Sequence, residues 1–177
     1  EMVRQAPERI THLALRNTTH RADKAGKQRL AQLDRVRRGE LDLVLRDELK
    51  PIYMHPDHRS PDRLDLLAAM ADDLGAQTFE RQTKALMLRR AYTALLPRIA
   101  CPTLVLTGEE DAVCPPDCHQ EIAQRIPDAT LSLISRCGHL STIEHPGAVN
   151  EALLELLARP ARPASHAVAT GQLCETL

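Results

Sequence analysis

The sequence predicts an α/β protein with a parallel sheet of about three strands and an inserted helical segment. Three short apolar runs rich in Val, Ile, Leu and Thr are separated by stretches of helical periodicity. The run Thr103-Leu-Val-Leu-Thr107 is continuous, not alternating, which is typical of a strand that is covered on both faces. Strands that alternate with helices along the sequence form parallel pairs, because a connection between parallel strands needs a long crossover.

The composition is that of a globular protein without a strongly charged partner. The 23 basic and 24 acidic residues leave a net charge of −1, so no overall field attracts nucleic acid or an anionic membrane. No apolar run approaches the roughly 18 residues that span a bilayer. Aromatic residues make up 2% of the chain, so stacking on nucleic-acid bases is not expected either. We expect no nucleic-acid and no membrane partner, and the oligomeric state stays open.

The first 20 residues are expected to be a core segment. Residues 1–6 predict the last turns of a helix that stops at Pro7, and Ile10 to Leu15 predicts a short buried strand. A chain that opens inside a helix is expected to be a fragment, and a leader peptide before Glu1 stays open. Five cysteines without a C-x-x-C pair indicate reduced thiols, which favours a cytoplasmic location.

Residues 21–98 are expected to form a helical cap. Proline and glycine positions predict four helices in it, near residues 21–38, 41–49, 61–75 and 77–96. Pro51 to Pro61 predicts a loop. Seven Lys or Arg residues lie between Arg21 and Arg38, and either an anion-attracting lid or an ordinary solvated helix face accounts for them. The near-neutral charge of the whole chain favours the solvated face.

Residues 99–158 are expected to complete the core. Thr103 to Thr107 and Ala129 to Ile134 predict two buried strands, and each is followed by a helix, near residues 117–126 and 149–157. Residues 159–177 turn to Pro, Ala, Ser and Thr, which predicts a disordered tail.

A reactive side chain follows each of these two strands. Asp111 ends Gly108-Glu-Glu-Asp111, and His139 ends Cys137-Gly-His139. The carboxyl ends of parallel strands meet at one edge of a sheet, so the two side chains are expected to meet there. An acid that orients an imidazole, which then takes the proton of a serine or cysteine, makes up two thirds of a nucleophilic triad. Glu109 and Glu110 are expected to stay solvated.

The order strand, Gly108-Glu-Glu-Asp111, helix, strand, Cys137-Gly-His139, helix resembles the C-terminal half of the α/β-hydrolase superfamily, in particular its esterase and lactonase-like enzymes. The resemblance implies that Asp111 is the family acid, His139 the family base, and Glu144 a structural acid that holds the histidine loop. In the full-length protein it implies hydrolysis of an ester, a lactone or a related small acyl or carbonyl substrate through a Ser-Asp-His triad, with no cofactor and no metal.

The nucleophile is the missing member of this triad. No serine of the chain lies in G-x-S-x-G; the five serines are Ser60, Ser132, Ser135, Ser141 and Ser165. The resemblance implies a nucleophile and an oxyanion hole upstream of Glu1, so the isolated chain is expected to be inactive. The alternative is a non-catalytic ligand-binding member of the same fold, which the absence of G-x-S-x-G upstream would favour.

A zinc site is a further alternative. Its ligands would come from Cys114, Cys118, His119, Cys137 and His139. The C-x-x-x-C-H spacing departs from the usual structural-zinc patterns, so a role as small buried hydrophobes is favoured for the thiols. His55 and His58 have H-x-x-H spacing, but no further ligand pattern completes a site around them.

Overall fold

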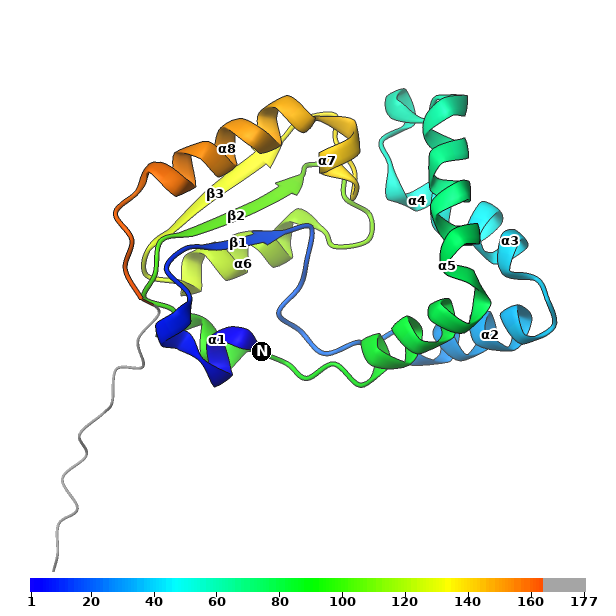
Figure 1. Cartoon of the computed structure of the whole chain (residues 1–177), viewed down its shortest axis with the longest axis horizontal. Helices are drawn as coiled ribbons and strands as arrows, with labels where there is room; N and C mark the ends of the chain where they lie inside the picture. The colour runs from blue at the N-terminus through cyan, green and yellow to red at the C-terminus, as the bar shows by residue number, and fades with distance from the viewer. Residues whose placement is uncertain (164–177) are drawn as a thin grey trace, which may run out of the picture.

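A computed structural model describes residues 1–163 and shows a three-stranded parallel sheet with a helical segment beside it (Figure 1). The strands are β1 (Leu13–Arg16), β2 (Thr103–Gly108) and β3 (Ala129–Ile134), in the order β1-β2-β3. Both pairs are parallel, and the register places Thr103 opposite Leu13 on one side and opposite Ala129 on the other. The predicted α/β class with a parallel sheet is confirmed.

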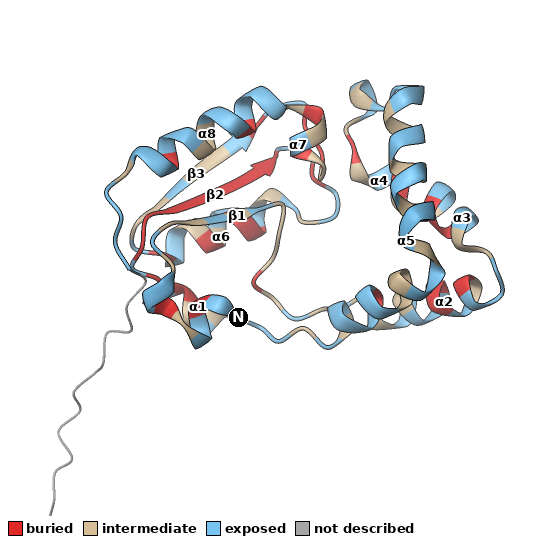
Figure 2. Cartoon of the chain, viewed as in Figure 1, coloured by how far each residue is buried: buried red, intermediate tan, exposed pale blue. Residues whose placement is uncertain are grey.

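Different helices cover the two faces of the sheet. α6 (Pro116–Arg125) packs on one face, where Val105 of β2 joins a buried apolar cluster. α8 (Pro146–Ala158) packs on the other, where Leu106 joins a second cluster. Successive residues of a strand point to opposite faces, so β2 contributes to both clusters and is buried along its whole length (Figure 2).

Between β1 and β2 the chain leaves the sheet as a helical segment, residues 26–98. Its α-helices are α2 (Gly26–Arg37), α3 (Leu41–Val44), α4 (Lys50–Tyr53) and α5 (Pro61–Met87). A π-helical turn (Leu45–Leu49) and two 3₁₀ helices (Pro56–His58 and Thr93–Arg98) complete it. In Figure 1 most of this segment lies beyond the carboxyl ends of β2 and β3, at the edge where the reactive residues were expected.

Several predicted boundaries in this segment are wrong. α2 begins at Gly26 instead of residue 21, because Arg21 is held by Glu121 of α6 and residues 21–25 stay out of the helix. Pro51 lies in the first turn of α4, where its missing N–H is tolerated, so the predicted loop starts only after Tyr53. The break predicted at Gly75 is confirmed: α5 consists of two helices that meet at Gly75, where the backbone leaves the helical conformation (φ 69°, ψ 170°).

The ends of the chain hold short elements. α1 (Met2–Gln5) ends before Pro7, which opens a 3₁₀ turn (Pro7–Arg9), so the first strand begins at Leu13 instead of Ile10. Residues 159–163 form neither helix nor strand, and the rest of the predicted disordered tail, with Ser165, lies outside the described residues. Within residues 1–163 no helix is long and apolar enough to span a membrane.

Candidate active site

Asp111 and His139 meet where the loops after β2 and β3 cross. Nδ1 of His139 lies 2.9 Å from Oδ2 and 3.1 Å from Oδ1 of Asp111. The loops touch through Gly108, where an added Cβ would lie 2.0 Å from the Cys137 carbonyl oxygen. Only glycine fits such an approach, so Gly108 allows the crossing that brings the acid to the histidine.

The Asp111 carboxylate is 2% exposed, and every described contact of its two oxygens is with a donor. Oδ1 accepts hydrogen bonds from the backbone N–H groups of Val113 (2.9 Å) and Cys114 (2.8 Å), and Oδ2 accepts one from Asn17 Nδ2 (3.0 Å). Burial alone raises the pKa of Asp111, but the hydrogen bonds from His139, Asn17 and Cys114 outweigh it and hold the pKa below its ordinary value. The site therefore keeps this carboxylate ionised at neutral pH.

An ionised Asp111 determines which imidazole nitrogen carries the proton. A carboxylate can only accept, so Nδ1 of neutral His139 is the N–H nitrogen and Nε2 keeps its lone pair. Among the described residues none hydrogen-bonds to Nε2, and the side chain of His139 is 21% exposed. The free nitrogen is thus available to accept a proton from a group that enters beside it.

The backbone of the histidine loop is held by Glu144 of α7 (Ser141–Glu144), which is 3% exposed. Oε2 of Glu144 accepts from the N–H groups of Gly138 (2.9 Å) and His55 (2.7 Å), and Oε1 accepts from that of Leu140 (3.1 Å). The structural role expected for Glu144 agrees with these contacts. Because His55 belongs to the helical segment, the same carboxylate also joins this segment to the histidine loop.

Further contacts fasten the helical segment to the loop. The N–H groups of His139 and Leu140 both donate to the Tyr53 carbonyl oxygen, at 2.8 and 3.1 Å. A Cβ on Gly138 would lie 2.8 Å from the backbone nitrogen of His55, so the two backbones are in direct contact. Nε2 of His58 lies 3.0 Å from Nε2 of His145. The end of α4 and the turn after it therefore form one wall next to His139.

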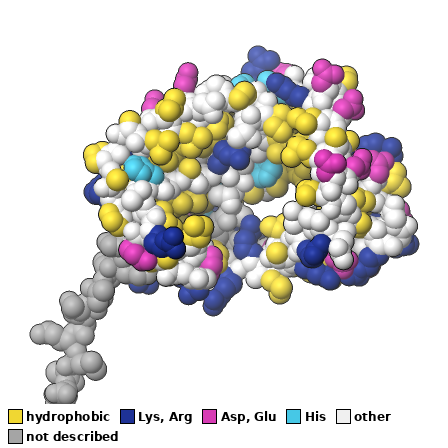
Figure 3. Space-filling model, viewed as in Figure 1, with side chains coloured by type: hydrophobic (Ala, Val, Ile, Leu, Met, Phe, Trp, Pro, Cys, Tyr) yellow, Lys and Arg dark blue, Asp and Glu magenta, His cyan; other side chains and the backbone are white. Residues whose placement is uncertain are grey.

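A cavity of about 770 Å³ opens beside His139, lined by the loops after β1 and β2 and by the helical segment. Tyr53 lines it too, with its ring centroid 6.0 Å from that of His139. Figure 3 shows a hollow between the sheet and the helical segment, with Lys and Arg side chains along its lower rim. His139 therefore lies in the wall of this cavity.

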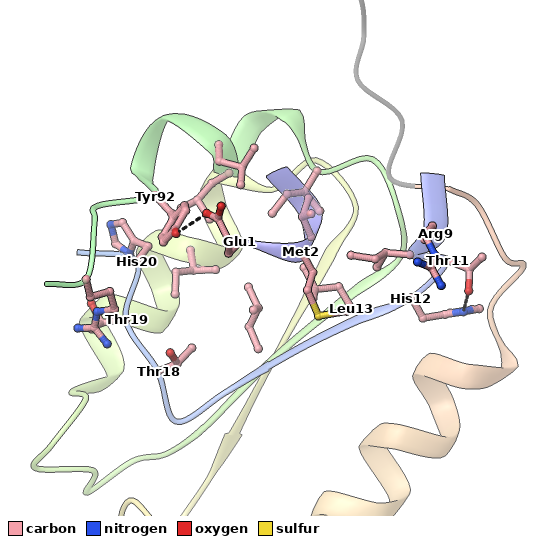
Figure 4. A pocket seen from close by; sticks show the side chains of 18 residues that line it. Glu1, Met2, Arg9, Thr11, His12, Leu13, Thr18, Thr19, His20 and Tyr92 are labelled. Atoms are coloured by element: carbon pink, nitrogen blue, oxygen red, sulfur yellow. Dashed lines mark hydrogen bonds between the residues drawn. The ribbon is translucent and has the colours of Figure 1, made fainter. Parts of the chain in front are cut away.

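A second cavity, of about 640 Å³, lies on the other side of β1 and contains neither Asp111 nor His139. Its lining is mostly apolar and includes Leu13 of β1, while Tyr92 donates a hydrogen bond to Glu1 at 2.7 Å at its rim (Figure 4). The outer edge of β1 has no strand beside it in the described part of the chain. Neither member of the acid and histidine pair lines this cavity, and Arg89 lines both cavities.

The residues of the zinc hypothesis have other partners. Nε2 of His119 accepts a hydrogen bond from the Thr18 N–H at 2.9 Å, and burial lowers the pKa of this imidazole. His139 is held by Asp111. No group of three or more His, Cys, Asp or Glu side chains within residues 1–163 is arranged to hold a metal ion.

Asn17 is a member of the site that the sequence did not single out. Its Nδ2 donates to Asp111, and its Oδ1 accepts from Ser141 Oγ at 2.6 Å, so Ser141 is a structural partner and not a neighbour of Nε2. Asn17 directly follows β1 at φ 44°, a conformation that Asn tolerates. Its position directly after β1, at the same edge of the sheet as Asp111, is the feature from which the sequence could have identified it.

Glu110 is exposed as expected, but its carboxylate also accepts a hydrogen bond from the Cys137 N–H at 3.0 Å.

Comparison with known proteins gives the family. The sequence model of the alpha/beta hydrolase family matches residues 12–152. A curated relative, the 2-hydroxy-6-oxononadienedioate/2-hydroxy-6-oxononatrienedioate hydrolase of a Pseudomonas species, is 36% identical over 81 residues, which is 46% of this chain and 29% of that protein. A thermophilic esterase from Thermogutta terrifontis superposes with a TM-score of 0.81 at 29% identity, covering 88% of this chain and 58% of that one.

A second solved structure supports the fold alone. The enol-lactonase from Burkholderia xenovorans LB400 superposes with a TM-score of 0.74 at 23% identity, over 89% of this chain and 60% of that one. The chain thus spans 60% or less of each of these three proteins. The match of the family model over most of the sequence is decisive, and the chain belongs to the alpha/beta hydrolase family.

Proposed function

We propose that this chain supplies the acid and the base of a serine hydrolase that cleaves an ester, a lactone or a related carbonyl compound. The proposal rests on the hydrogen bond between Nδ1 of His139 and the buried Asp111 carboxylate, which leaves Nε2 free beside a cavity. Membership of a hydrolase family agrees with it.

The reaction follows from these positions. A serine hydroxyl placed at Nε2 of His139 loses its proton to this nitrogen as its oxygen attacks the substrate carbonyl carbon. The imidazolium is stabilised by Asp111 and then gives the proton to the leaving group, which breaks the bond and leaves an acyl-enzyme. Water, deprotonated by His139 in turn, releases the acid. Asp111 stays ionised throughout, in line with its lowered pKa.

The serine of this mechanism is proposed to lie outside the described residues. Two thiols, Cys114 and Cys118, line the cavity with His139, and Cys118 is buried. Burial, together with the charge of Asp111, raises the pKa of Cys114 to about 11. At pH 7 only about one in 10,000 thiols with such a pKa is deprotonated, so Cys114 is a poor nucleophile. A carbonyl substrate agrees with the names of the esterase and of the Pseudomonas hydrolase among the relatives.

A ligand-binding protein without catalysis is the second candidate. The observation that favours it is that none of the serines of this chain lies in G-x-S-x-G. Such a protein would bind carbonyl compounds in the cavity beside His139 and would release them unchanged.

Turnover by the product of the whole reading frame separates the two candidates. We expect hydrolysis of p-nitrophenyl butyrate, a loss of at least about 1,000-fold on His139→Ala or Asp111→Asn, and a change within about twofold on the control His12→Ala, far from the pair. No turnover above the buffer rate would favour the binding protein. The isolated 177-residue chain is expected to be inactive, and turnover by it that His139→Ala abolishes would overturn that part of the proposal.

A further inference from the structure

Arg89 is a cation in the cavity beside His139, and its charge acts on Asp23 of the same lining without forming an ion pair among the described residues. It follows the end of α5 and lines this cavity. Its Nε is buried, and among the described residues no atom accepts a hydrogen bond from it. A buried guanidinium N–H without an acceptor is unfavourable. A carboxylate in the cavity would supply the acceptor after a turn of the Arg89 side chain toward it.

Several other basic residues of the helical segment have acidic partners. Arg35 donates to Glu40 at 2.8 Å, and Arg37 donates to Glu80 at 2.7 Å. The solvated-face interpretation of the basic residues fits these two, which lie away from the cavity. Arg89 lies outside the basic run considered in the sequence.

The lining of the cavity carries an excess of positive charge. Four of its side chains are cationic, namely Arg21, Lys24, Arg29 and Arg89, and one is a carboxylate, Asp23. Arg29 donates to Asp23 at 2.9 Å, which neutralises this carboxylate. Arg21 is held by Glu121 of α6. The remaining charge favours an anion inside the cavity.

The charge of Arg89 reaches the part of the cavity next to the site. Burial raises the pKa of the Cys114 thiol, and the Arg89 and Arg29 guanidiniums act in the opposite direction. Cys114 donates its backbone N–H to Asp111, so the thiol lies directly beside the acid and histidine pair. Both guanidiniums therefore share one cavity with Cys114 and His139.

We infer that Arg89, assisted by Arg29, binds a carboxylate group of the substrate while the carbonyl carbon of the same substrate lies at His139. A guanidinium presents two parallel N–H groups to a carboxylate, so it would fix the substrate's orientation as well as its position. The inference rests on the proposed function for the identity of the ligand as a substrate. It names the substrate class as esters, lactones or ketones that carry a free carboxylate.

Binding to the 177-residue chain tests this inference without any turnover. Isothermal titration calorimetry compares hexanoate with hexanamide, which has the same shape and no charge. We expect hexanoate to bind at least about tenfold more tightly, and Arg89→Gln to remove this preference. Arg90→Gln is the matched control, because Arg90 is the exposed neighbour and does not line the cavity. It is expected to keep the preference.

A measurement on the unaltered chain covers the case in which Arg89→Gln fails to fold. The Nε–H resonance of Arg89 in a ¹H–¹⁵N spectrum is expected to shift on addition of hexanoate and to stay in place with hexanamide. Equal affinity for the two probes, no binding of either, or a stationary Nε–H resonance would overturn the inference. Since binding needs no nucleophile, these results are independent of whether the full-length protein hydrolyses esters.

Discussion

Glu144→Gln tests how firmly the histidine loop is held. The substitution keeps the shape of the side chain and removes its charge. A glutamine oxygen can still accept from Gly138 and His55, but two charge-assisted bonds become neutral ones, which weakens each by about 1 kcal/mol. The amide NH₂ then faces the Leu140 N–H, donor against donor, and this adds about 1 kcal/mol. We expect the free energy of unfolding to fall by about 3 kcal/mol.

Urea unfolding followed by circular dichroism measures this loss. With an m-value of about 2 kcal/mol/M, the expected decrease moves the midpoint down by about 1.5 M. The control is Glu151→Gln on α8, because Glu151 is exposed, and it is expected to stay within about 0.5 kcal/mol of the parent. If the Glu144→Gln midpoint matched that of the control, Glu144 would not be what holds the loop, and the assignment would be wrong.

Three further predictions follow from the site. Gly108→Ala places a Cβ 2.0 Å from the Cys137 oxygen and is expected to lower the melting temperature by at least about 10 °C, whereas Gly147→Ala, with no atom within 4 Å, is expected to leave it nearly unchanged. Asp111 has a lowered pKa in the folded chain, so the ionised carboxylate stabilises the fold fully above about pH 4, and this contribution is lost as the pH falls further. The free energy of unfolding of Asp111→Asn should therefore fall less than that of the parent between about pH 5 and pH 2. Cys114, with a pKa raised to about 11, should react with iodoacetamide about tenfold faster per pH unit up to about pH 10, and a rate that levels off near pH 9, as for an ordinary thiol, would refute the raised pKa.

Features that depend on local sequence patterns could be predicted from the sequence. The β3 bounds were predicted as observed, and β2 differs by one residue, because continuous β-branched runs next to Gly and Pro define buried strands well. The meeting of Asp111 and His139 followed from the rule that parallel strands end at one edge. The two residues lie 28 positions apart, and no local pattern alone would join them.

The contacts that surround the pair could not be predicted in this way. Asn17 reaches Asp111 across 94 positions, and His139 bonds to the backbone of Tyr53, which belongs to the helical segment. Such contacts depend on how the segment packs against the sheet, and helical periodicity does not encode that packing. The predicted start of α2 at residue 21 was wrong for the same reason, since Arg21 is held by a tertiary ion pair.

The most direct test of the central claim is the protonation state of the two ring nitrogens of His139. A long-range ¹H–¹⁵N spectrum of the ¹⁵N-labelled chain, recorded at a pH where the ring is neutral, distinguishes the two tautomers. Orientation of His139 by Asp111 predicts the Nδ1–H tautomer in the parent and a shift toward Nε2–H in Asp111→Asn. An Nε2–H tautomer in the parent, or a tautomer that Asp111→Asn leaves unchanged, would contradict the proposal that this pair prepares His139 to act as the base.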